Sequence, residues 1–341
     1  MLNALYRLVA PRQFEICFSE PELTGKEILV RPTHLAICNA DQRYYQGLRS
    51  PEVLSQKLPM ALIHEGIGRV CFDPTGTFRR GQRVVMIPNL PTETDPVIAE
   101  NYLRSSRFRS SGYDGLMQEL VSNPSDRLVA LPDSVPDEVA AFTEIISVSF
   151  HAIRRFAQIA HSRRERIGIW GDGNLAYITA LLLHTLYPQL SLYIFGIDPQ
   201  KLSAFTFARE TLHVSHIPAG LTLDHAFECV GGGGSAKAID QIIDHICPEG
   251  TISILGVSEN PVPINTRMIL EKGLRLFGSS RSGRTDFAET VDLFARSPQL
   301  VGYLGNLVGE QFSIHTIADM SAAFEADIRK SFGKTILRWE I

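Results

Sequence analysis

The sequence predicts an α/β protein with two domains, one mostly β and one built on a doubly wound parallel sheet. Three observations carry this prediction. Short β-like runs broken by Gly and Pro fill the first third of the chain, strands alternate with helices from about residue 139, and Gly171-Asp-Gly173-Asn-Leu-Ala176 joins a strand to a helix. Alternating strands and helices indicate a parallel sheet, and a length of 341 residues suits two domains better than one.

The N-terminal region is predicted to be mostly β. Apolar runs at 27–31, 67–71 and 83–87 have the length and composition of strands, and Gly81 supplies a turn before the last of them. A polar stretch follows from 89 to 115, where we expect a loop.

Helices and strands alternate in the second region. We expect helices at 140–155 and 177–187, and strands at 166–170, 192–195, 224–230, 251–255 and 274–277. The last apolar run, 333–339, predicts a strand that returns to the first domain. The predicted boundaries are therefore 1–147 with 279–341 for the first domain, and 148–278 for the second.

The composition excludes several classes of partner. The chain has 33 basic and 37 acidic residues, so it lacks the basic excess of a nucleic-acid-binding protein. Its start lacks the apolar region of a signal peptide, and its longest apolar stretch, 177–187, is too short to span a bilayer. Five widely spaced cysteines favour free or metal-bound thiols in a reducing compartment. We expect a cytoplasmic protein with no nucleic-acid or membrane partner.

The glycine-rich turn predicts a dinucleotide site. Gly171 permits the tight turn, Gly173 lets the backbone approach a pyrophosphate, and Ala176 allows close packing of helix on strand. The phosphate charge would then lie at a helix N-terminus. The residues expected around the pyrophosphate are Gly171, Asp172, Gly173, Asn174 and Leu175.

The end of the next strand favours NADP over NAD. An NAD enzyme usually has an acidic residue there, which binds the ribose 2′-hydroxyl. Gly196 occupies that place, and Lys201 is available to pair with a 2′-phosphate. The alternative is that Asp198, two residues later, binds the ribose of NAD while Lys201 is solvated.

Three separated segments carry residues that suit a zinc ion. Taken singly, Cys38 is a small buried residue, Asp41 a helix cap, His64-Glu65 a polar pair, and Glu144 the polar face of a helix. Taken together, a thiolate, an imidazole and carboxylates match a catalytic zinc site, which usually has three protein ligands and an open position.

The order of these motifs resembles the zinc-dependent medium-chain dehydrogenase/reductase superfamily over essentially the whole chain. The resemblance implies a GroES-like catalytic domain and a Rossmann domain. Glu144, where alcohol dehydrogenases carry a second cysteine, is similar to the polyol dehydrogenases. Other segments resemble the bacterial ribulose-5-phosphate reductases, also called ribitol-5-phosphate dehydrogenases. The motifs that carry the resemblance are Cys38-x-x-Asp41, His64-Glu-Gly-x-Gly68, Tyr113-Asp-Gly-Leu-Met-Gln-Glu119, Phe227-Glu-Cys-Val-Gly231, Asp41-Gln-Arg-Tyr-Tyr45 and Gly278-Ser-Ser-Arg-Ser-Gly283.

The resemblance implies a set of roles for the metal residues. Cys38, His64 and Glu144 are implied as zinc ligands, Glu65 as a fourth ligand that alternates with substrate or water, and Asp41 as the residue that orients His64. Which of the two glutamates binds zinc in the resting state stays open.

Two departures from the family pattern matter. The stretch 89–115 has no cysteines where many members bind a structural zinc, so one zinc per subunit is expected. Ala40 replaces the hydroxyl residue that relays a proton in alcohol dehydrogenases, which leaves Tyr44, Glu65 or a water for that role.

The implied function is the reversible, NADPH-dependent reduction of D-ribulose 5-phosphate to D-ribitol 5-phosphate. Zinc would act as a Lewis acid on the C2 carbonyl, and the product would supply CDP-ribitol for teichoic acid or capsule synthesis. The implied partners are a second copy of the chain and a ribitol-5-phosphate cytidylyltransferase. Two alternatives stay open, an NAD-dependent dehydrogenase of sorbitol or xylitol and a non-catalytic NADP-binding subunit of a cytidylyltransferase complex.

A sugar phosphate would need cationic side chains, because a dianion prefers Arg and Lys donors. Arg43 lies beside the metal loop, Arg109 lies in the basic loop before Tyr113, and Arg281 lies at the predicted domain junction. These three arginines are the candidates for the substrate phosphate.

Overall fold

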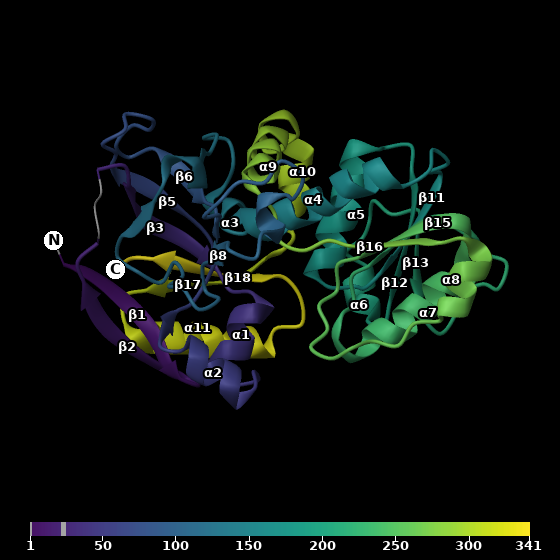
Figure 1. The fold of residues 1–341 in the computed structure, drawn as a ribbon, viewed down its shortest axis with the longest axis horizontal. Coiled ribbons are helices and arrows are strands. Elements are labelled where there is room, and N and C mark those ends of the chain that lie inside the picture. Colours follow the sequence, from purple (N-terminus) through teal and green to yellow (C-terminus); the bar gives the residue numbers. More distant parts are fainter. Residues whose placement is uncertain (1, 22–24) are drawn as a thin grey trace. The chain divides into compact units, whose positions relative to one another are not determined.

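The computed structural model describes residues 2–21 and 25–341. The chain divides into two compact units, one formed by residues up to 147 and from 281 onward, the other by 148–280. In Figure 1 the first unit runs from purple to blue and returns in yellow, and the second is teal to green. No helix in the described ranges has the length and apolar character needed to cross a membrane.

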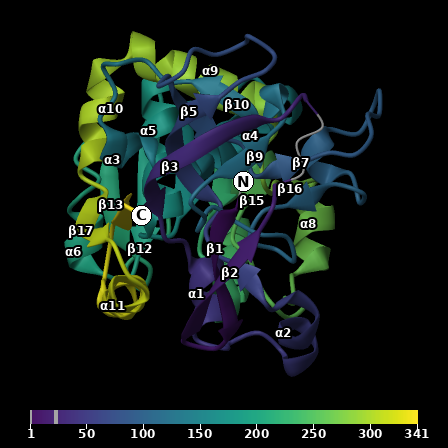
Figure 2. The ribbon, with the colours of Figure 1, turned by 90° about the vertical axis from the view of Figure 1, so that its left-hand side faces the viewer.

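The first unit is mostly β. Its seven-stranded sheet has the order β10-β6-β5-β3-β18-β17 with β9 paired to β3, beside a three-stranded sheet β2-β1-β4 and a two-stranded sheet β7-β8. Strands β1 and β2 form the purple hairpin of Figure 2. The strands are β1 (Asn3–Ala10), β2 (Gln13–Ser19), β3 (Ile28–Ala36), β4 (Met60–Ala61), β5 (Glu65–Phe72), β6 (Arg83–Met86), β7 (Asn89–Leu90), β8 (Arg107–Phe108), β9 (Val121–Asn123), β10 (Leu128–Ala130), β17 (Val308–Ile314) and β18 (Lys334–Trp339).

Short helices join these strands. The helix expected at 140–155 corresponds to one that begins at Thr143 and ends at Ile159, and a separate short helix precedes it at 137–140, so Glu144 lies in the first turn of the longer helix. The stretch 89–115, expected as a loop, contains a helical turn and the β7-β8 ladder. The helices are α1 (Asn39–Tyr45), α2 (Pro51–Lys57), η1 (Glu100–Tyr102), η2 (Ser125–Arg127), α3 (Asp137–Ala140), α9 (Arg284–Arg296), α10 (Pro298–Gly305), α11 (Ile317–Arg329) and α4 (Thr143–Ile159), which continues into the second unit.

Strand register brings distant segments of the first unit together. Ala36 near the end of β3 pairs with Glu65 on β5 and with Ile336 on β18. The strand predicted at 333–339 therefore does return to the first unit, where it lies between β3 and β17. As a result Cys38, Glu65 and Lys334 meet where these three central strands begin or end.

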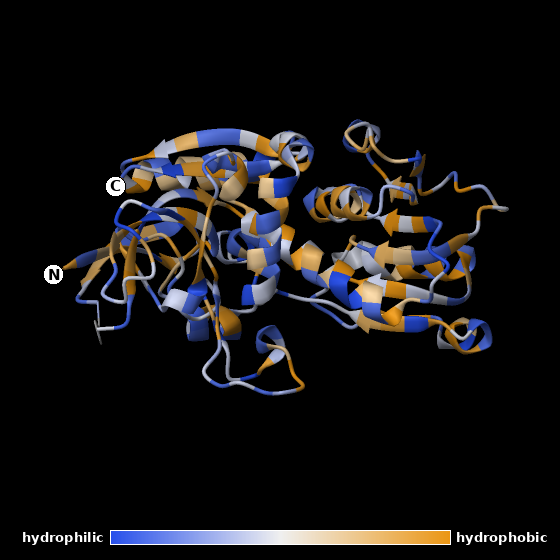
Figure 3. Ribbon diagram, turned by 90° about the horizontal axis from the view of Figure 1, so that it is seen from above, coloured by the Kyte–Doolittle hydropathy of each residue, from blue (hydrophilic) through white to orange (hydrophobic). Residues whose placement is uncertain are grey.

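The second unit has a six-stranded sheet of order β13-β12-β11-β14-β15-β16, and all its strand pairs are parallel. The order departs from β11 in both directions, so right-handed crossovers place α5 and α7 on opposite faces. The strands are mostly orange in Figure 3, as expected for a sheet covered on both faces. The elements are β11 (Arg166–Trp170), α5 (Asn174–Leu186), β12 (Ser191–Gly196), α6 (Pro199–Leu202), β13 (Glu210–His213), β14 (Leu223–Glu228), η3 (Gly232–Gly234), α7 (Ser235–His245), β15 (Ile246–Ile254), α8 (Thr266–Lys272) and β16 (Arg275–Gly278).

The predicted α/β class is confirmed. Each strand expected in the second region has its counterpart, and β11 has the bounds that the sequence predicted. The short edge strand β13 was not expected, because its residues are half-exposed and lack a clear apolar run.

Candidate functional site

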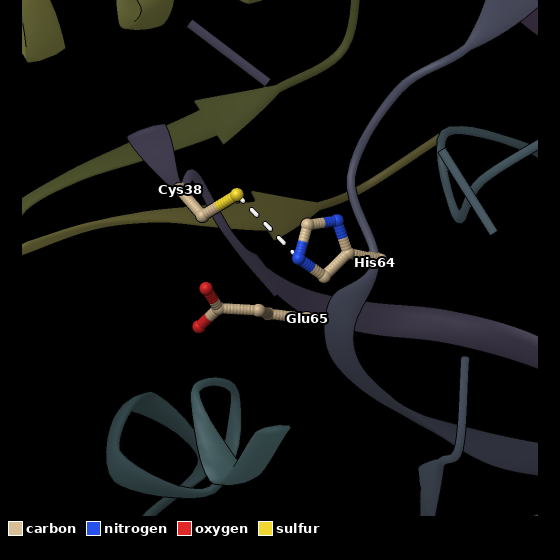
Figure 4. A group of neighbouring side chains, drawn as sticks. All are labelled: Cys38, His64 and Glu65. Atoms are coloured by element: carbon tan, nitrogen blue, oxygen red, sulfur yellow. Dashed lines mark hydrogen bonds between the residues drawn. The ribbon is translucent and has the colours of Figure 1, made fainter. Parts of the chain in front are cut away.

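Three of the expected zinc ligands form one cluster in the first unit. The ligand atoms of Cys38, His64 and Glu65 all lie within 4.8 Å of one another, and Cys38 Sγ is 3.5 Å from His64 Nε2. Figure 4 shows the sulfur facing this ring nitrogen, with the Glu65 carboxylate on the same side. Cys38 follows β3 and caps α1, whereas His64 and Glu65 are at the start of β5.

Asp41 fixes the backbone of both ligand segments. Its fully buried carboxylate accepts hydrogen bonds from the backbone N–H of Cys38 at 3.2 Å, the N–H of Ile63 at 2.9 Å and the hydroxyl of Ser110 at 2.7 Å. His64 Nδ1 is 3.8 Å from Asp41 Oδ1, beyond a hydrogen bond. Asp41 therefore acts on His64 mainly through the preceding peptide.

The backbone before His64 adopts an unusual conformation. Ile63 has φ +68°, which a β-branched residue adopts only when its surroundings enforce it. Its N–H is the group that Asp41 binds. The strained residue Ile63 is thus held by Asp41 on one side and is followed directly by the two candidate ligands, His64 and Glu65.

Glu65 is paired with a buried lysine. Lys334 Nζ donates to Glu65 Oε1 at 2.8 Å, and the two side chains are 2% and 1% exposed. Burial acts to lower the pKa of Lys334, but the charges of Glu65 and Cys38 outweigh it and raise that pKa, so the ammonium is kept. Glu65 Oε2 is buried without a hydrogen-bond partner. One carboxylate oxygen is thus neutralised while the other stays available to a ligand.

Glu144 lies at the margin of this cluster. It is 6% exposed, and the group of mutually close ligand atoms does not include it. Burial raises its pKa to about 7, with Glu65 and Asp41 adding to the shift while His64 and Lys334 oppose it. Glu144 therefore belongs to the electrostatic surroundings of the site, and its expected role as a ligand stays a prediction.

The donor set fits a zinc ion. Two ligands at the usual zinc–sulfur and zinc–nitrogen distances of a tetrahedral site lie about 3.6 Å apart, close to the 3.5 Å between Cys38 and His64. Burial, followed by the charges of Asp41 and Glu65, raises the pKa of the Cys38 thiol well above its ordinary value. A thiolate there needs a nearby cation, which zinc would supply.

One of the three arginines expected at the substrate phosphate, Arg281, is linked to the metal residues through an aromatic ring. Its guanidinium stacks on the Phe108 ring at 4.5 Å, and that ring lies 5.2 Å from the imidazole of His64. Burial lowers the pKa of Arg281, and the charge of Glu144 opposes that shift. Arg281 also has φ +58°, a costly conformation for a side chain of this size.

The other two arginines have different surroundings. Arg109 is 2% exposed and donates to the carbonyl oxygens of Ser122 and Asp114 and to Asn123 Oδ1. These bonds make Arg109 a structural residue of the first unit and argue against contact with a phosphate. Arg43 is half-buried in the last turn of α1.

The glycine-rich turn of the second unit has the geometry of a nucleotide site. Gly171 has φ +128°, and an added Cβ would lie 3.1 Å from the carbonyl group of Cys229. Gly173 caps α5, and no atom lies within 4 Å of where its Cβ would be. The backbone here is therefore open to a ligand at the N-terminus of a 13-residue helix. Asn174 and Leu175 form the first turn of that helix.

The end of β12 is arranged differently from an NAD site. Gly196 ends the strand, and Asp198 Oδ1 caps α6 by accepting from Gln200 N at 2.9 Å and Lys201 N at 3.3 Å. Lys201 Nζ lies 3.9 Å from the other oxygen of Asp198. Asp198 thus caps its own helix through Oδ1, and its other oxygen faces Lys201.

Three residues of the metal site were not predicted from the sequence. Lys334, Phe108 and Ser110 contact Glu65, His64 and Asp41 respectively. Each is distant in sequence from its partner and stands in no recognisable motif; strand register brings Lys334 to Glu65, whereas Phe108 and Ser110 reach the site from the segment 107–110, which is outside that sheet.

Comparisons with known proteins agree with this geometry. A family model described as the alcohol dehydrogenase GroES-like domain matches residues 24–133, and one described as zinc-binding dehydrogenase matches 197–296. The chain is 57% identical over 341 residues to the ribulose-5-phosphate reductase of Bacillus spizizenii, covering 100% of both chains. It is 56% identical over 339 residues to ribulose-5-phosphate reductase 1 of Staphylococcus aureus, covering 99% of each.

A solved structure is similar over its whole length. The crystal structure of S. aureus TarJ in complex with NADPH matches with a TM-score of 0.90 and 50% sequence identity, covering 100% of both chains. The match therefore extends over the residues of both units.

Proposed function

Because the chain belongs to the zinc-dependent medium-chain dehydrogenase/reductase family, we propose that it reduces D-ribulose 5-phosphate to D-ribitol 5-phosphate with NADPH, reversibly. The observation that carries the proposal is the buried Cys38–His64–Glu65 cluster in a chain whose full-length relatives at 57% and 56% identity are ribulose-5-phosphate reductases. The cofactors are zinc and NADP(H).

The reaction adds a hydride and a proton to the C2 ketone. When bound, NADPH supplies the hydride and zinc supplies the Lewis acid that draws electron density from the carbonyl oxygen. Cys38 and His64 would hold the metal, and Asp41 fixes the backbone of both segments through hydrogen bonds to the N–H groups of Cys38 and Ile63. Lys334 offsets the negative charge of Glu65, so less of the positive charge of a bound zinc ion would be cancelled by its protein surroundings.

The proton needs a route that does not use a hydroxyl at position 40, where the chain has Ala40. Tyr44 is 4% exposed within the core of the first unit. Glu65 Oε2 is buried without a hydrogen-bond partner, whereas Oε1 is held by Lys334. We assign the transfer of the proton to Glu65, directly or through a water.

Arg281 is our candidate for the substrate phosphate. It lies against Phe108, which in turn contacts the ring of His64, and its guanidinium offers the planar donors that phosphate oxygens prefer. Its strained backbone fits a residue kept in place for binding. Arg281→Lys should raise KM for ribulose 5-phosphate far more than it lowers kcat, because the contact is made in ground state and transition state alike.

The proposal includes a cellular setting. The protein would act on a sugar phosphate as a homodimer in the cytoplasm. It would deliver ribitol 5-phosphate to a cytidylyltransferase that makes CDP-ribitol, which is then used for teichoic acid or capsule. In the described residues none of the five cysteines forms a disulfide, which suits a reducing compartment. Sedimentation of the purified chain with and without a ribitol-5-phosphate cytidylyltransferase tests both assemblies.

One assay tests the catalytic proposal against its rivals. The purified chain alone is given NADPH or NADH with ribulose 5-phosphate or ribulose, and zinc is quantified on the same sample. We expect turnover with NADPH and the phosphorylated sugar and about one zinc per subunit. Equal use of NADH and ribulose would instead identify an NAD-linked polyol dehydrogenase, and no turnover would identify a non-catalytic subunit.

A further inference from the structure

The end of β12 carries a contact that the nucleotide motif does not require. Asp172, the middle residue of the Gly171-Asp-Gly173 turn, reaches across to the next strand. Its Oδ2 accepts hydrogen bonds from the backbone N–H of Ile197 at 2.7 Å and of Asp198 at 2.9 Å. A side chain of the first βα turn therefore fixes the backbone that follows the second strand.

The same side chain fills the space in front of Gly196. A Cβ at position 196 would lie 2.7 Å from both Cβ and Oδ2 of Asp172, and 2.9 Å from Leu202 Cδ2. The leucine methyl is the end of a flexible side chain, but Asp172 is tied to two backbone groups. Any residue larger than glycine at 196 must therefore displace Asp172 and break those bonds.

The consequence concerns the cofactor. In NAD enzymes an acidic residue at this strand end accepts a hydrogen bond from the ribose 2′-hydroxyl, and it repels a 2′-phosphate. Here position 196 itself cannot supply an acid while Asp172 is in place, and the carboxylate that lies at this strand end is that of Asp172, held by two backbone N–H groups. The two carboxylates nearby, those of Asp172 and Asp198, are both engaged by backbone N–H groups. Lys201 Nζ lies 3.9 Å from Asp198 Oδ2.

We propose that Asp172 is a positioning residue that determines cofactor specificity. Its side chain occupies the space that any side chain at position 196 would need, and it fixes the turn at 197–198. In this way it selects NADPH over NADH. The proposal rests on the NADPH dependence proposed above and adds the residue that enforces it. It concerns the second unit alone.

The test is a double-mutant cycle read by binding. Dissociation constants for NADPH and NADH are measured by fluorescence titration, without sugar substrate, for the native protein, Gly196→Asp, Asp172→Gly and the double variant. We expect Gly196→Asp alone to weaken NADPH by at least about tenfold without tightening NADH, because its side chain has no room. The double variant should bind NADH at least about tenfold more tightly than Gly196→Asp does.

Milder variants keep the test decisive if an aspartate at 196 impairs folding. Gly196→Ala adds only a methyl group, so it should weaken both nucleotides, and Asp172→Gly in the same chain should restore them. Asp172→Asn keeps the size and an acceptor oxygen, so the ratio of the two dissociation constants should stay within about threefold of the native ratio.

The outcomes separate the two proposals. If Gly196→Asp alone binds NADH as tightly as the double variant, or if Gly196→Ala has no effect, Asp172 does not obstruct position 196 and the inference is wrong. If the native protein binds NADH as tightly as NADPH, the proposed cofactor is wrong instead. Because no sugar is present, an error in the assigned substrate does not affect either result.

Discussion

The metal cluster of the first unit is made of side chains from separated segments, whereas the nucleotide site of the second unit is one run of consecutive residues. Cys38, His64-Glu65 and Lys334 meet only because β3, β5 and β18 pair in one register. The turn at 171–175 depends on backbone conformation and the absence of side chains. The first site should therefore be sensitive to buried charge, and the second to added atoms.

The largest effect should come from removing the thiolate. Cys38→Ala deletes one of three close donors, so zinc should be lost, and turnover should fall by at least about 10³-fold, since Lewis-acid stabilisation is worth several kcal/mol. Affinity for NADPH should be unchanged, because the turn at 171–175 lies in the other unit. Metal analysis, turnover and nucleotide titration on one sample check this. Full activity without zinc would contradict the mechanism.

Lys334→Met should give the largest loss of stability. It leaves Glu65 buried without its cation, and breaking a buried ion pair costs about 3–5 kcal/mol. The free energy of unfolding of the zinc-free protein, measured with denaturant, tests this. Glu65→Gln combined with Lys334→Met removes both charges and should recover most of the loss. An unstable double variant would show that Lys334 acts through packing rather than charge.

The zinc-free protein should lose stability as pH rises from about 4.5 to about 7. Burial raises the pKa of Glu144 to about 7 in the folded state, from 4.5. Between pH 4.5 and pH 7 the folded protein keeps Glu144 protonated, whereas the unfolded protein does not. The contribution of Glu144 to the free energy of unfolding is therefore complete below about pH 4.5 and is lost as the pH rises to about 7. It amounts to about 3 kcal/mol. Glu144→Gln should flatten this part of the pH profile, and a profile that is unchanged in the variant would assign the effect elsewhere.

Asp41→Asn should weaken zinc binding by about 10–100-fold, the usual cost of losing a residue that supports metal ligands. In the native protein each carboxylate oxygen of Asp41 accepts from one backbone N–H, that of Cys38 or that of Ile63. Asparagine keeps one acceptor oxygen but places an NH₂ group against the other N–H. Competition with a chelator measures the change. Ser110→Ala removes one donor to the same carboxylate and serves as the control, with a smaller loss expected. Equal losses would indicate a general weakening of the loop.

The same contrast explains what the sequence could predict. The turn at 171–176 and the strand before it were predicted correctly, because local periodicity and glycine spacing determine them. Cys38, His64 and Glu65 were found by residue type and resemblance, and the structure brings them together. Lys334 was not found, because its contact with Glu65 depends on strand register, and Phe108 was not found, because it reaches His64 from a separate two-stranded sheet. The sequence could not show that Arg109 is buried among backbone carbonyls, and its role at the phosphate stays a prediction.

The smallest effects should come from two glycines of the nucleotide turn, and the pair separates conformation from contact. Gly171→Ala places a Cβ at φ +128° and 3.1 Å from Cys229, so both thermal stability and NADPH affinity should fall, the latter by about tenfold. Gly173→Ala meets no protein atom within 4 Å, so stability should hold while affinity falls, because the backbone must approach the pyrophosphate. Zinc content should be native in both. If Gly173→Ala binds NADPH normally, the pyrophosphate does not lie over this turn, and the difference between the two sites would then have to be sought in another segment of the second unit.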